Sequence, residues 1–327
     1  MNKLKRVSFA AVGRELHIDI PLSNVALDYR PHEMIADMLC PVVPTPNISG
    51  QIPTFSRKDR LTTEDDHRAP GTAARSIHRT VGSDSFLCKN RALNFPVNIE
   101  DRYNADPIYV QKLFNNAVEY LKGKLMLNWE RRIALQVNST SNVGSSSAVS
   151  SAWSDSTDGN SDPLGDLNTA LDNVQDTTGV RPNRITFGLT SWRLVRRHNN
   201  VRNLVFGTNN GGGYVSRQQI ADLLEVEQVL VGEAYRDANA EGLSESITKL
   251  WDNNVLVSYS PQSPSTMEPS FMYAFRWSVA GIPNMQVERH PYDTRRKTYD
   301  TELGYYQDEK ITGSEYAFLL LAVDSAT

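Results

Sequence analysis

The chain has 327 residues, with 34 basic and 38 acidic side chains and a formal net charge of −4. No run of like charges is long enough to neutralise a nucleic-acid backbone, which argues against tight duplex binding. Two cysteines, Cys40 and Cys88, are too few for a disulfide framework or a cysteine zinc site, so we expect small buried side chains in a reducing compartment. The apolar runs at 7–12 and 316–323 fall far short of the roughly 20 residues that a membrane helix needs.

The first 105 residues contain prolines throughout and one short stretch of helical period, at 33–39. Proline at this density favours extended chain. Two strand-like pieces, 52–55 and 86–95, flank a polar and charged middle. They predict a long two-stranded excursion with a loose tip. Because an isolated hairpin is marginal in water, we expect a further surface to cover it, with another subunit as one candidate.

A single long helix is predicted from Asp106 to Asn138. Asp106 is a good N-cap, Pro107 suits the first helical position, and residues that favour a break follow only from Ser139 onward. At 1.5 Å per residue, such a helix is a rod of roughly 48 Å. We expect the rest of the chain to be organised around it.

The apolar positions of this helix do not form a straight stripe. Those from Val110 to Leu121 share one face, but those from Leu121 to Val137 recur every four residues, and each step turns the stripe by about 40°. A wrapping stripe cannot face one straight partner, so we expect the two halves of the helix to lie under different elements. Gly123, near the middle, is a candidate bend.

The second half of the chain alternates between polar connections and short periodic segments. The polar stretch 139–161, around Trp153, has the composition of a linker or surface loop. A helix is expected to start after Asp162 and to end near Gly179. An α+β segment and mixed polar and aromatic runs follow it. The predicted strands are 184–188, 228–232, 255–260, 271–279, 285–288 and 316–323, the predicted helices are 191–198 and 217–224, and a charged turn region joins the last two strands.

No set of residues has the spacing of a catalytic or metal site. The acidic and histidine residues at 64–67 would point to opposite sides of an extended chain, so a solvated or partner-facing loop tip is favoured over a metal site. The glycine-rich 207–213 lacks the Lys-Ser/Thr of a phosphate-binding loop, which favours a flexible connection. The six histidines are scattered, and no serine lies in a Gly-x-Ser-x-Gly motif. We therefore expect no enzyme, no cofactor and no metal.

Charge is unevenly distributed along the chain. Residues 57–91 hold eight basic and five acidic side chains, a net charge of +3, whereas 285–327 hold five basic and eight acidic side chains, a net charge of −3. Opposite charges on an outlying arm and a separate body would steer one copy onto the next, and ordinary scatter of charge is the alternative. For the basic trio 295–297, a solvated turn is favoured over ion pairing between subunits. The candidate inter-subunit residues are Arg57, Lys58, Arg60, Arg68, Arg75, Arg79, Arg295, Arg296 and Lys297.

Seven stretches of the chain carry a family resemblance. They are IADMLCPVVPTPNISGQIPTF at 35–55, RAPGTAAR at 68–75, FLCKNRALNFPV at 86–97, RYNADP at 102–107, TGVRPNRITFG at 178–188, SRQQIADLLEVEQVLVGEAY at 216–235 and LWDNNVLVSYSP at 250–261. In this order they resemble one branch of the major capsid proteins of tailed bacteriophages with the Hong Kong 97-like fold. No single stretch is diagnostic, but together they span nearly the whole chain.

The resemblance implies an α+β fold of the Hong Kong 97-like type, with an N-terminal arm, an extended β-hairpin loop, a long spine helix with a peripheral sheet, and an α+β axial domain. The implied divisions are 1–45 for the arm, 46–96 for the extended loop, 97–161 for the peripheral domain with the spine helix 106–138, 162–281 for the axial domain and 282–327 for a second peripheral segment. It implies no catalytic, cofactor or metal residues.

The function implied by the resemblance is self-assembly into pentamers and hexamers of an icosahedral shell that encloses packaged double-stranded DNA. The alternative is the shell of a bacterial encapsulin-like nanocompartment. The implied partners are further copies of the chain, a portal at one vertex, DNA through weak non-specific contact, and a cement protein, with no membrane. A separate scaffolding protein is expected because arm and loop account for the residues before the long helix. The implied location is the virion, after assembly in the host bacterial cytoplasm.

Overall fold

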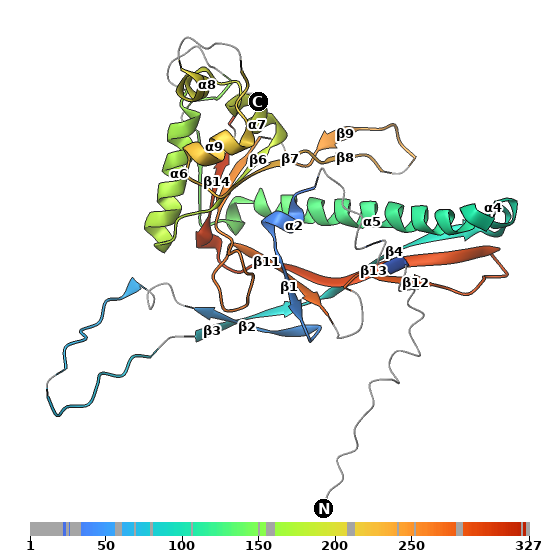
Figure 1. The fold of residues 1–327 in the computed structure, drawn as a ribbon, viewed down its shortest axis with the longest axis horizontal. Coiled ribbons are helices and arrows are strands. Elements are labelled where there is room, and N and C mark those ends of the chain that lie inside the picture. Colours follow the sequence, from blue (N-terminus) through green and yellow to red (C-terminus); the bar gives the residue numbers. More distant parts are fainter. Residues whose placement is uncertain are drawn as a thin grey trace, which may run out of the picture.

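One long helix, α5 (Pro107–Val137), runs along the molecule and confirms the helix predicted from the sequence (Figure 1). Helix α4 (Ile99–Asn104) precedes it, and the predicted N-cap Asp106 lies outside the residues that the structure describes. The structure is a computed structural model, and the residues it describes are 22–23, 26, 34–55, 61–68, 70–78, 81–105, 107–149, 151–154, 161–207, 213–240, 242–251, 253–278, 284–321 and 323–324.

A five-stranded sheet, here called the β13 sheet, packs along α5 through two of its strands, β4 and β13. The strand β13 is central, because β4 pairs along one side of it while β12 and β11 pair at different ends of the other side. The short strand β1 extends the sheet by pairing in parallel with β11. The strands are β1 (Val42–Thr45), β4 (Lys89–Asn98), β11 (Met272–Trp277), β12 (Gln286–Arg289) and β13 (Thr298–Ile311).

The second large sheet, here called the β10 sheet, has the order β5-β14-β10-β6-β7. Helix α6 packs over β14 and β10, whereas α7 and α9 pack over β6 and β7, and a shared apolar core joins them to α8. The strands are β5 (Ser145–Ala148), β6 (Arg184–Gly188), β7 (Gln228–Gly232), β10 (Val255–Ser258) and β14 (Ala317–Leu321). The helices are α6 (Pro163–Thr178), α7 (Leu189–Val195), α8 (Asn199–Phe206) and α9 (Arg217–Leu223).

Local sequence explains where two of these helices end and begin. Gly179 follows α6 with a φ of 67°, a left-handed conformation in which glycine has no Cβ to strain. Ser216 caps α9 with its hydroxyl, and the side chain of Gln219 accepts a hydrogen bond from the Ser216 N–H in return. This reciprocal capping box satisfies two backbone donors that the first turn of a helix leaves free.

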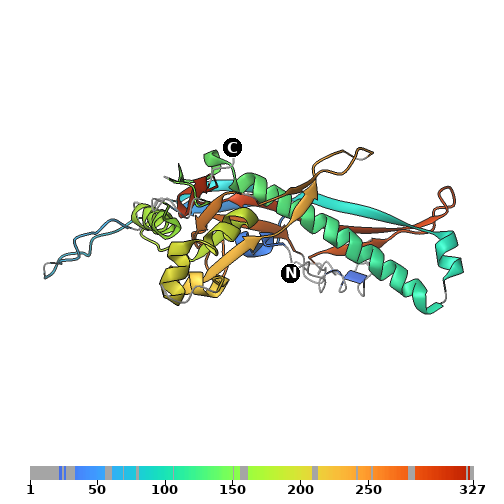
Figure 2. The same cartoon turned by 90° about the horizontal axis from the view of Figure 1, so that it is seen from above.

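Two small sheets project from this body (Figures 1 and 2). One pairs β2 (Ser49–Phe55) with β3 (Val81–Leu87), and the other pairs β8 (Tyr235–Asp237) with β9 (Ile247–Lys249). The chain between β2 and β3 reaches away from the rest of the molecule in both views. The remaining short elements are α2 (Ala36–Leu39), η2 (Thr140–Asn142) and η3 (Ser314–Tyr316).

The two halves of α5 are buried against different elements, which confirms the prediction drawn from its wrapping stripe. Phe114 and Leu121 lie in a cluster with apolar residues of β4, β12 and β13. Trp129 and Ile133 lie in a second cluster with residues of α2, β7, β10, β11 and β14. The helix therefore supports the β13 sheet along its first half and joins both large sheets along its second half.

Several strands and both cysteines confirm their predictions. The strands β6 and β7 have the predicted bounds, and β10, β11, β12 and β14 lie within or beside theirs. Cys40 and Cys88 are buried and unpaired, and burial raises the pKa of both thiols.

The predicted return strand 86–95 is wrong as a single element. It breaks at Cys88, so that β3 pairs with β2 while β4 leaves the hairpin and pairs with β13. The predicted charged turn region between 289 and 315 is also wrong, because it contains β13, the longest strand. That strand buries polar side chains, among them Thr301 and Gln307, so apolar and polar residues do not alternate along it.

The segment 139–161 is more than a linker. It supplies β5 to the edge of the β10 sheet, and Trp153 is buried with its indole N–H donating to Asp166 Oδ2 at 2.8 Å. The strand pairing also crosses the boundaries expected at 161/162 and 281/282. Strand β11 joins the β13 sheet, although the axial domain was expected to include it, while β5 and β14 join the β10 sheet.

Candidate functional site

The excursion between β2 and β3 carries most of the basic residues singled out as inter-subunit candidates. Arg57, Lys58, Arg60 and Arg79 lie outside the described residues. Arg68 donates from Nε to the Thr72 carbonyl oxygen at 2.5 Å, and Arg75 pairs with Glu64 at 2.8 Å. Both arginines are exposed. Exposed pairs of this kind add little to stability, so these side chains remain accessible to a further chain.

The base of the hairpin is covered by other strands of its own chain, so the expected covering surface lies within the subunit at this end, and cover by another subunit remains a prediction for the tip. The rings of Phe86 and Phe275 stack with centroids 5.0 Å apart, inside a small cluster that includes Ile52. Lys310 Nζ lies 2.5 Å from Asp84 Oδ1, and its hydrogen bond lowers the pKa of Asp84. The hairpin is thus fixed to β11 and β13, while its tip is left uncovered.

The basic trio 295–297 lies in the turn between β12 and β13. Asp293 Oδ1 accepts the backbone N–H groups of Arg295 and Arg296, at 2.8 and 3.3 Å, and Lys297 has a positive φ of 58°. All three side chains are exposed in this turn of the single subunit. In Figures 1 and 2 the turn and the excursion lie at opposite ends of the molecule. One chain therefore does not bring the two groups of candidates together, and their inter-subunit role remains a prediction.

Gly123 lies in an uninterrupted stretch of α5 and lines a cavity of about 430 Å³ with Tyr120, Lys124, Met34 and Tyr235. A Cβ built at this glycine would meet no atom within 4 Å. The glycine is thus not required by close packing inside the subunit, and its role as a bend remains a prediction.

Replacing Gly123 with alanine is expected to raise the free energy of unfolding by up to about 1 kcal/mol, because alanine loses less backbone entropy in a helix and the site has room for its methyl group. Chemical denaturation of the subunit measures the change. Gly165→Ala in α6 is the comparison, since its Cβ would lie 2.5 Å from Asp162 Oδ2, so the carboxylate must shift and the gain should be smaller. Normal assembly of the Gly123→Ala variant would contradict the proposed bend.

A buried carboxylate joins α5 to two other parts of the chain. Glu130 is fully buried and accepts the backbone N–H groups of Ile35 and Ala36, at 3.0 and 2.7 Å, and the indole N–H of Trp251. Burial raises the pKa of Glu130 to about 7, against the lowering effect of these donors. This residue was not predictable from the sequence, because a single acid beside an apolar stripe gives no sign of partners that are far away in the chain.

A second buried polar network links α5 to the centre of the β13 sheet. Arg276 donates to Gln307 Oε1, Gln307 Nε2 donates to Glu309 Oε1 at 3.0 Å, and Arg132 of α5 pairs with the same oxygen at 2.5 Å. The Arg276 guanidinium also lies over the rings of Trp129 and Tyr305. This network explains how a strand with charged residues can occupy the middle of a sheet. No local pattern in the sequence predicted the network.

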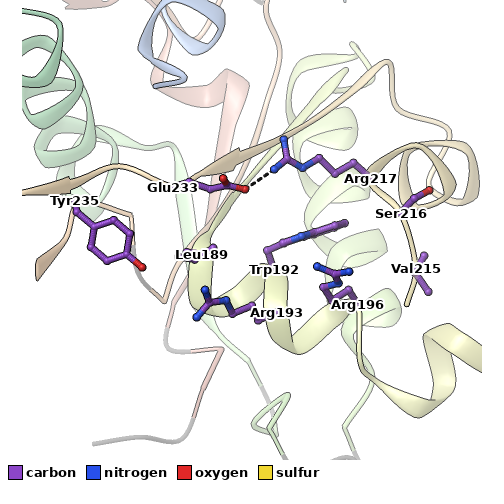
Figure 3. Close-up of a pocket in the computed structure, with 9 residues that line it drawn as sticks. All are labelled: Leu189, Trp192, Arg193, Arg196, Val215, Ser216, Arg217, Glu233 and Tyr235. Carbon is purple, nitrogen blue, oxygen red and sulfur yellow. Dashed lines mark hydrogen bonds and ion pairs between the residues drawn. The ribbon is translucent and has the colours of Figure 1, made fainter. Parts of the chain in front are cut away.

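A basic pocket of about 510 Å³ opens between α7, the start of α9 and β8 (Figure 3). Arg193 of α7, Arg196 directly after α7 and Arg217 of α9 line it around Trp192. Glu233, an acid in its lining, pairs with Arg217 at 2.5 Å. We call this pocket, which was not predicted from the sequence, the arginine pocket.

Neither a metal cluster nor a membrane span is present among the residues that the structure describes. No three metal-ligating side chains gather there, and no helix is long and apolar enough to cross a bilayer. At the loop tip, Asp65 accepts the backbone N–H of His67.

Comparison with known proteins finds relatives among phage capsid proteins. No family model matches the chain. The major capsid protein of Burkholderia phage BcepMu is 25% identical over 289 residues, which cover 86% of this chain and 90% of that protein. The major capsid protein of Pseudomonas phage JBD67 is 26% identical over 235 residues, which cover 72% of this chain and 74% of that protein.

Solved structures share the fold at greater sequence distance. A phage-related protein from Bordetella bronchiseptica aligns with a TM-score of 0.75 and 23% identity, covering 95% of this chain and 98% of that one. The capsid structure of cyanophage P-SCSP1u aligns with a TM-score of 0.53 and 14% identity, covering 91% of this chain and 90% of that one. The chain is a homologue of phage major capsid proteins and has the Hong Kong 97-like fold.

The chain confirms the expected α+β architecture, with its spine helix α5 and hairpin loop β2–β3. The encapsulin of Synechococcus elongatus also shares the fold, with a TM-score of 0.54 and 10% identity over 94% of this chain and 96% of that one. That likeness extends to the fold alone. Because the curated relatives are phage capsid proteins, the phage assignment is preferred to the nanocompartment alternative.

Proposed function

We propose that this capsid protein self-assembles into pentamers and hexamers of an icosahedral shell around packaged double-stranded DNA. The supporting observation is the excursion between β2 and β3, whose tip leaves the body of the subunit. Leu61 and Ile77 in this excursion are 51% and 71% exposed. Burial of such side chains against an adjacent copy would remove apolar surface from water and give the tip the cover that its own chain does not provide.

The two large sheets suggest a division of labour within the subunit. The β10 sheet with α6 to α9 is proposed to form the axial part at the centre of each pentamer or hexamer, and α5 with the β13 sheet the peripheral part. This keeps the division expected at 162–281 but moves β11 to the peripheral part and β5 and β14 to the axial part. Residues 1–45 remain the proposed arm, and 46–96 the proposed extended loop.

The proposed partners beyond further copies of the chain are a separate scaffolding protein, a portal at one vertex, a cement protein, and packaged DNA held by weak non-specific contact. Assembly in the host bacterial cytoplasm is part of the proposal. The subunit is proposed to act through binding surfaces and without catalytic turnover.

Electron microscopy of the purified protein, expressed alone and together with its neighbouring genes, tests the proposal. Closed shells of uniform size are the expected result. Stable monomers under every condition would contradict it, and terminase and portal genes beside the coding sequence would distinguish a phage shell from a nanocompartment.

Charge reversal at Arg57, Lys58 and Arg60 to glutamate is expected to impair assembly, because the net charge of the loop region would change sign relative to the acidic region 285–327. Sedimentation of assembled shells measures the effect, and circular dichroism should show an unchanged subunit. Normal shells from this triple variant would remove the case for electrostatic docking of the loop.

A further inference from the structure

The arginine pocket is formed largely by a segment of the chain whose charged side chains are all positive. Residues 189–217 contain five arginines and no acidic residue. Since Glu233 pairs with Arg217, the acidic lining residue is already engaged. Arg193 is exposed and makes no ion pair within the described part of the chain, and the buried Nε of Arg196 has no hydrogen-bond partner there. Among the described residues, the pocket therefore presents two guanidinium groups without an anionic partner, of which that of Arg196 lies 4.8 Å from the centroid of the Tyr214 ring.

Helix α6 carries the opposite charge. From Asp162 to Gly179 the chain contains four acidic residues and no basic one. Asp172 and Asp176 are exposed and one turn apart, and neither has an ion-pair partner among the described residues. Like charges at this spacing destabilise a helix by a few tenths of a kcal/mol, so the subunit alone leaves an unfavourable interaction in place.

The two charged surfaces lie on one face of the β10 sheet but toward its opposite edges. Helix α6 packs over β14 and β10, whereas α7 and α9 pack over β6 and β7. Figure 1 shows α6 at the outer margin of this part of the molecule, with α7 and β8 on the other side. Surfaces of opposite charge on opposite sides of one subunit can meet only between two copies, in a head-to-tail contact. Such contacts close into a ring when the rotation from one copy to the next divides a full turn into a whole number of steps.

We propose that the acidic face of α6, through Asp172 and Asp176, docks into the arginine pocket of the next copy around the ring. The inference specifies one interface between subunits of the proposed shell, and it rests on the proposed function as a shell protein. Arginine suits it, because its planar guanidinium group can hold a carboxylate through two parallel hydrogen bonds. Trp192 would limit the access of water to these bonds from one side of the pocket.

A charge-swap experiment on the full chain tests the contact. Arg193→Glu and Asp176→Arg are each expected to raise the protein concentration needed for assembly by at least about tenfold, because like charges would then face each other. The variant that carries both substitutions should regain assembly close to the wild-type concentration. Arg131→Glu, which changes the net charge as Arg193→Glu does at an exposed position of α5, is the matched control and should leave the threshold unchanged.

Coexpression of the two single variants provides a second, independent test of the contact. In an even-numbered ring with alternating subunits, every contact again pairs opposite charges, so hexamers should form from a mixture of two variants that each fail alone. Wild-type thresholds for the single variants, or no recovery in either the double variant or the mixture, would overturn the contact. Failure of the wild-type chain itself to form shells would instead refute the proposed function. Circular dichroism of each variant verifies the fold.

Discussion

Replacing Glu309 with alanine should lower the free energy of unfolding of the subunit by about 3–5 kcal/mol, the range expected when one partner of a buried ion pair is removed. The Glu309 side chain is 4% exposed. Its oxygen accepts from both Arg132 and Gln307, and Arg276 lies in the same network. The variant would leave Arg132 without its counter-ion and Gln307 Nε2 without its acceptor. Chemical denaturation followed by circular dichroism measures the loss.

Glu302→Ala is the matched control for this experiment. It removes an acid from the same strand, β13, but its ion pair with His290 is more than a third exposed on both sides, so the expected loss is below about 1 kcal/mol. Glu309→Gln, which retains an oxygen acceptor, should fall between the two. Equal losses for Glu309→Ala and Glu302→Ala would show that the buried network does not stabilise the sheet.

Raising the pH from 4.5 to above 7 should reduce the free energy of unfolding by about 3 kcal/mol through Glu130 alone. Burial raises the pKa of this carboxyl from 4.5 to about 7 in the folded subunit. Between these values the folded chain keeps a proton that the unfolded chain has released, so unfolding releases that proton. A higher pH therefore favours the unfolded chain, and the contribution is complete below pH 4.5 and lost above 7.

Denaturation midpoints at several pH values, compared between the wild-type chain and Glu130→Gln, isolate this effect. Other groups titrate equally in both proteins and cancel in the difference between them. The glutamine variant should show a shallower decline of stability with pH. Parallel profiles for the two proteins would mean that Glu130 does not hold a raised pKa in the folded state.

Elements with strong local patterns could be predicted from the sequence. The helix α5 followed from its start signals and apolar spacing, and its wrapping stripe correctly indicated two different sets of partners. Strands β6 and β7 are short apolar runs bounded by turn residues, so their limits were visible. In each case neighbouring residues carry the whole signal.

Features that depend on distant pairing could not be predicted in this way. The strand β13 buries Gln307 and Glu309, so its composition is typical of a surface turn until Arg276 and Arg132 are brought beside it. Glu130 binds the backbone of Ile35, 95 residues away. The arginine pocket likewise forms only when α7 and α9 come together on one sheet. The seven family stretches indicated the fold but none of these contacts.

The exchange of strands between the two large sheets has a mechanical consequence. The described chain runs from β4 in one sheet to β5 in the other, returns through β11 to β13, and crosses again to β14. Pulling the sheets apart would therefore strip β14 from between β5 and β10 or break the apolar cluster that both sheets share with α5. A subunit connected in this way should resist separation of its two sheets under load, which would suit the wall of the proposed shell.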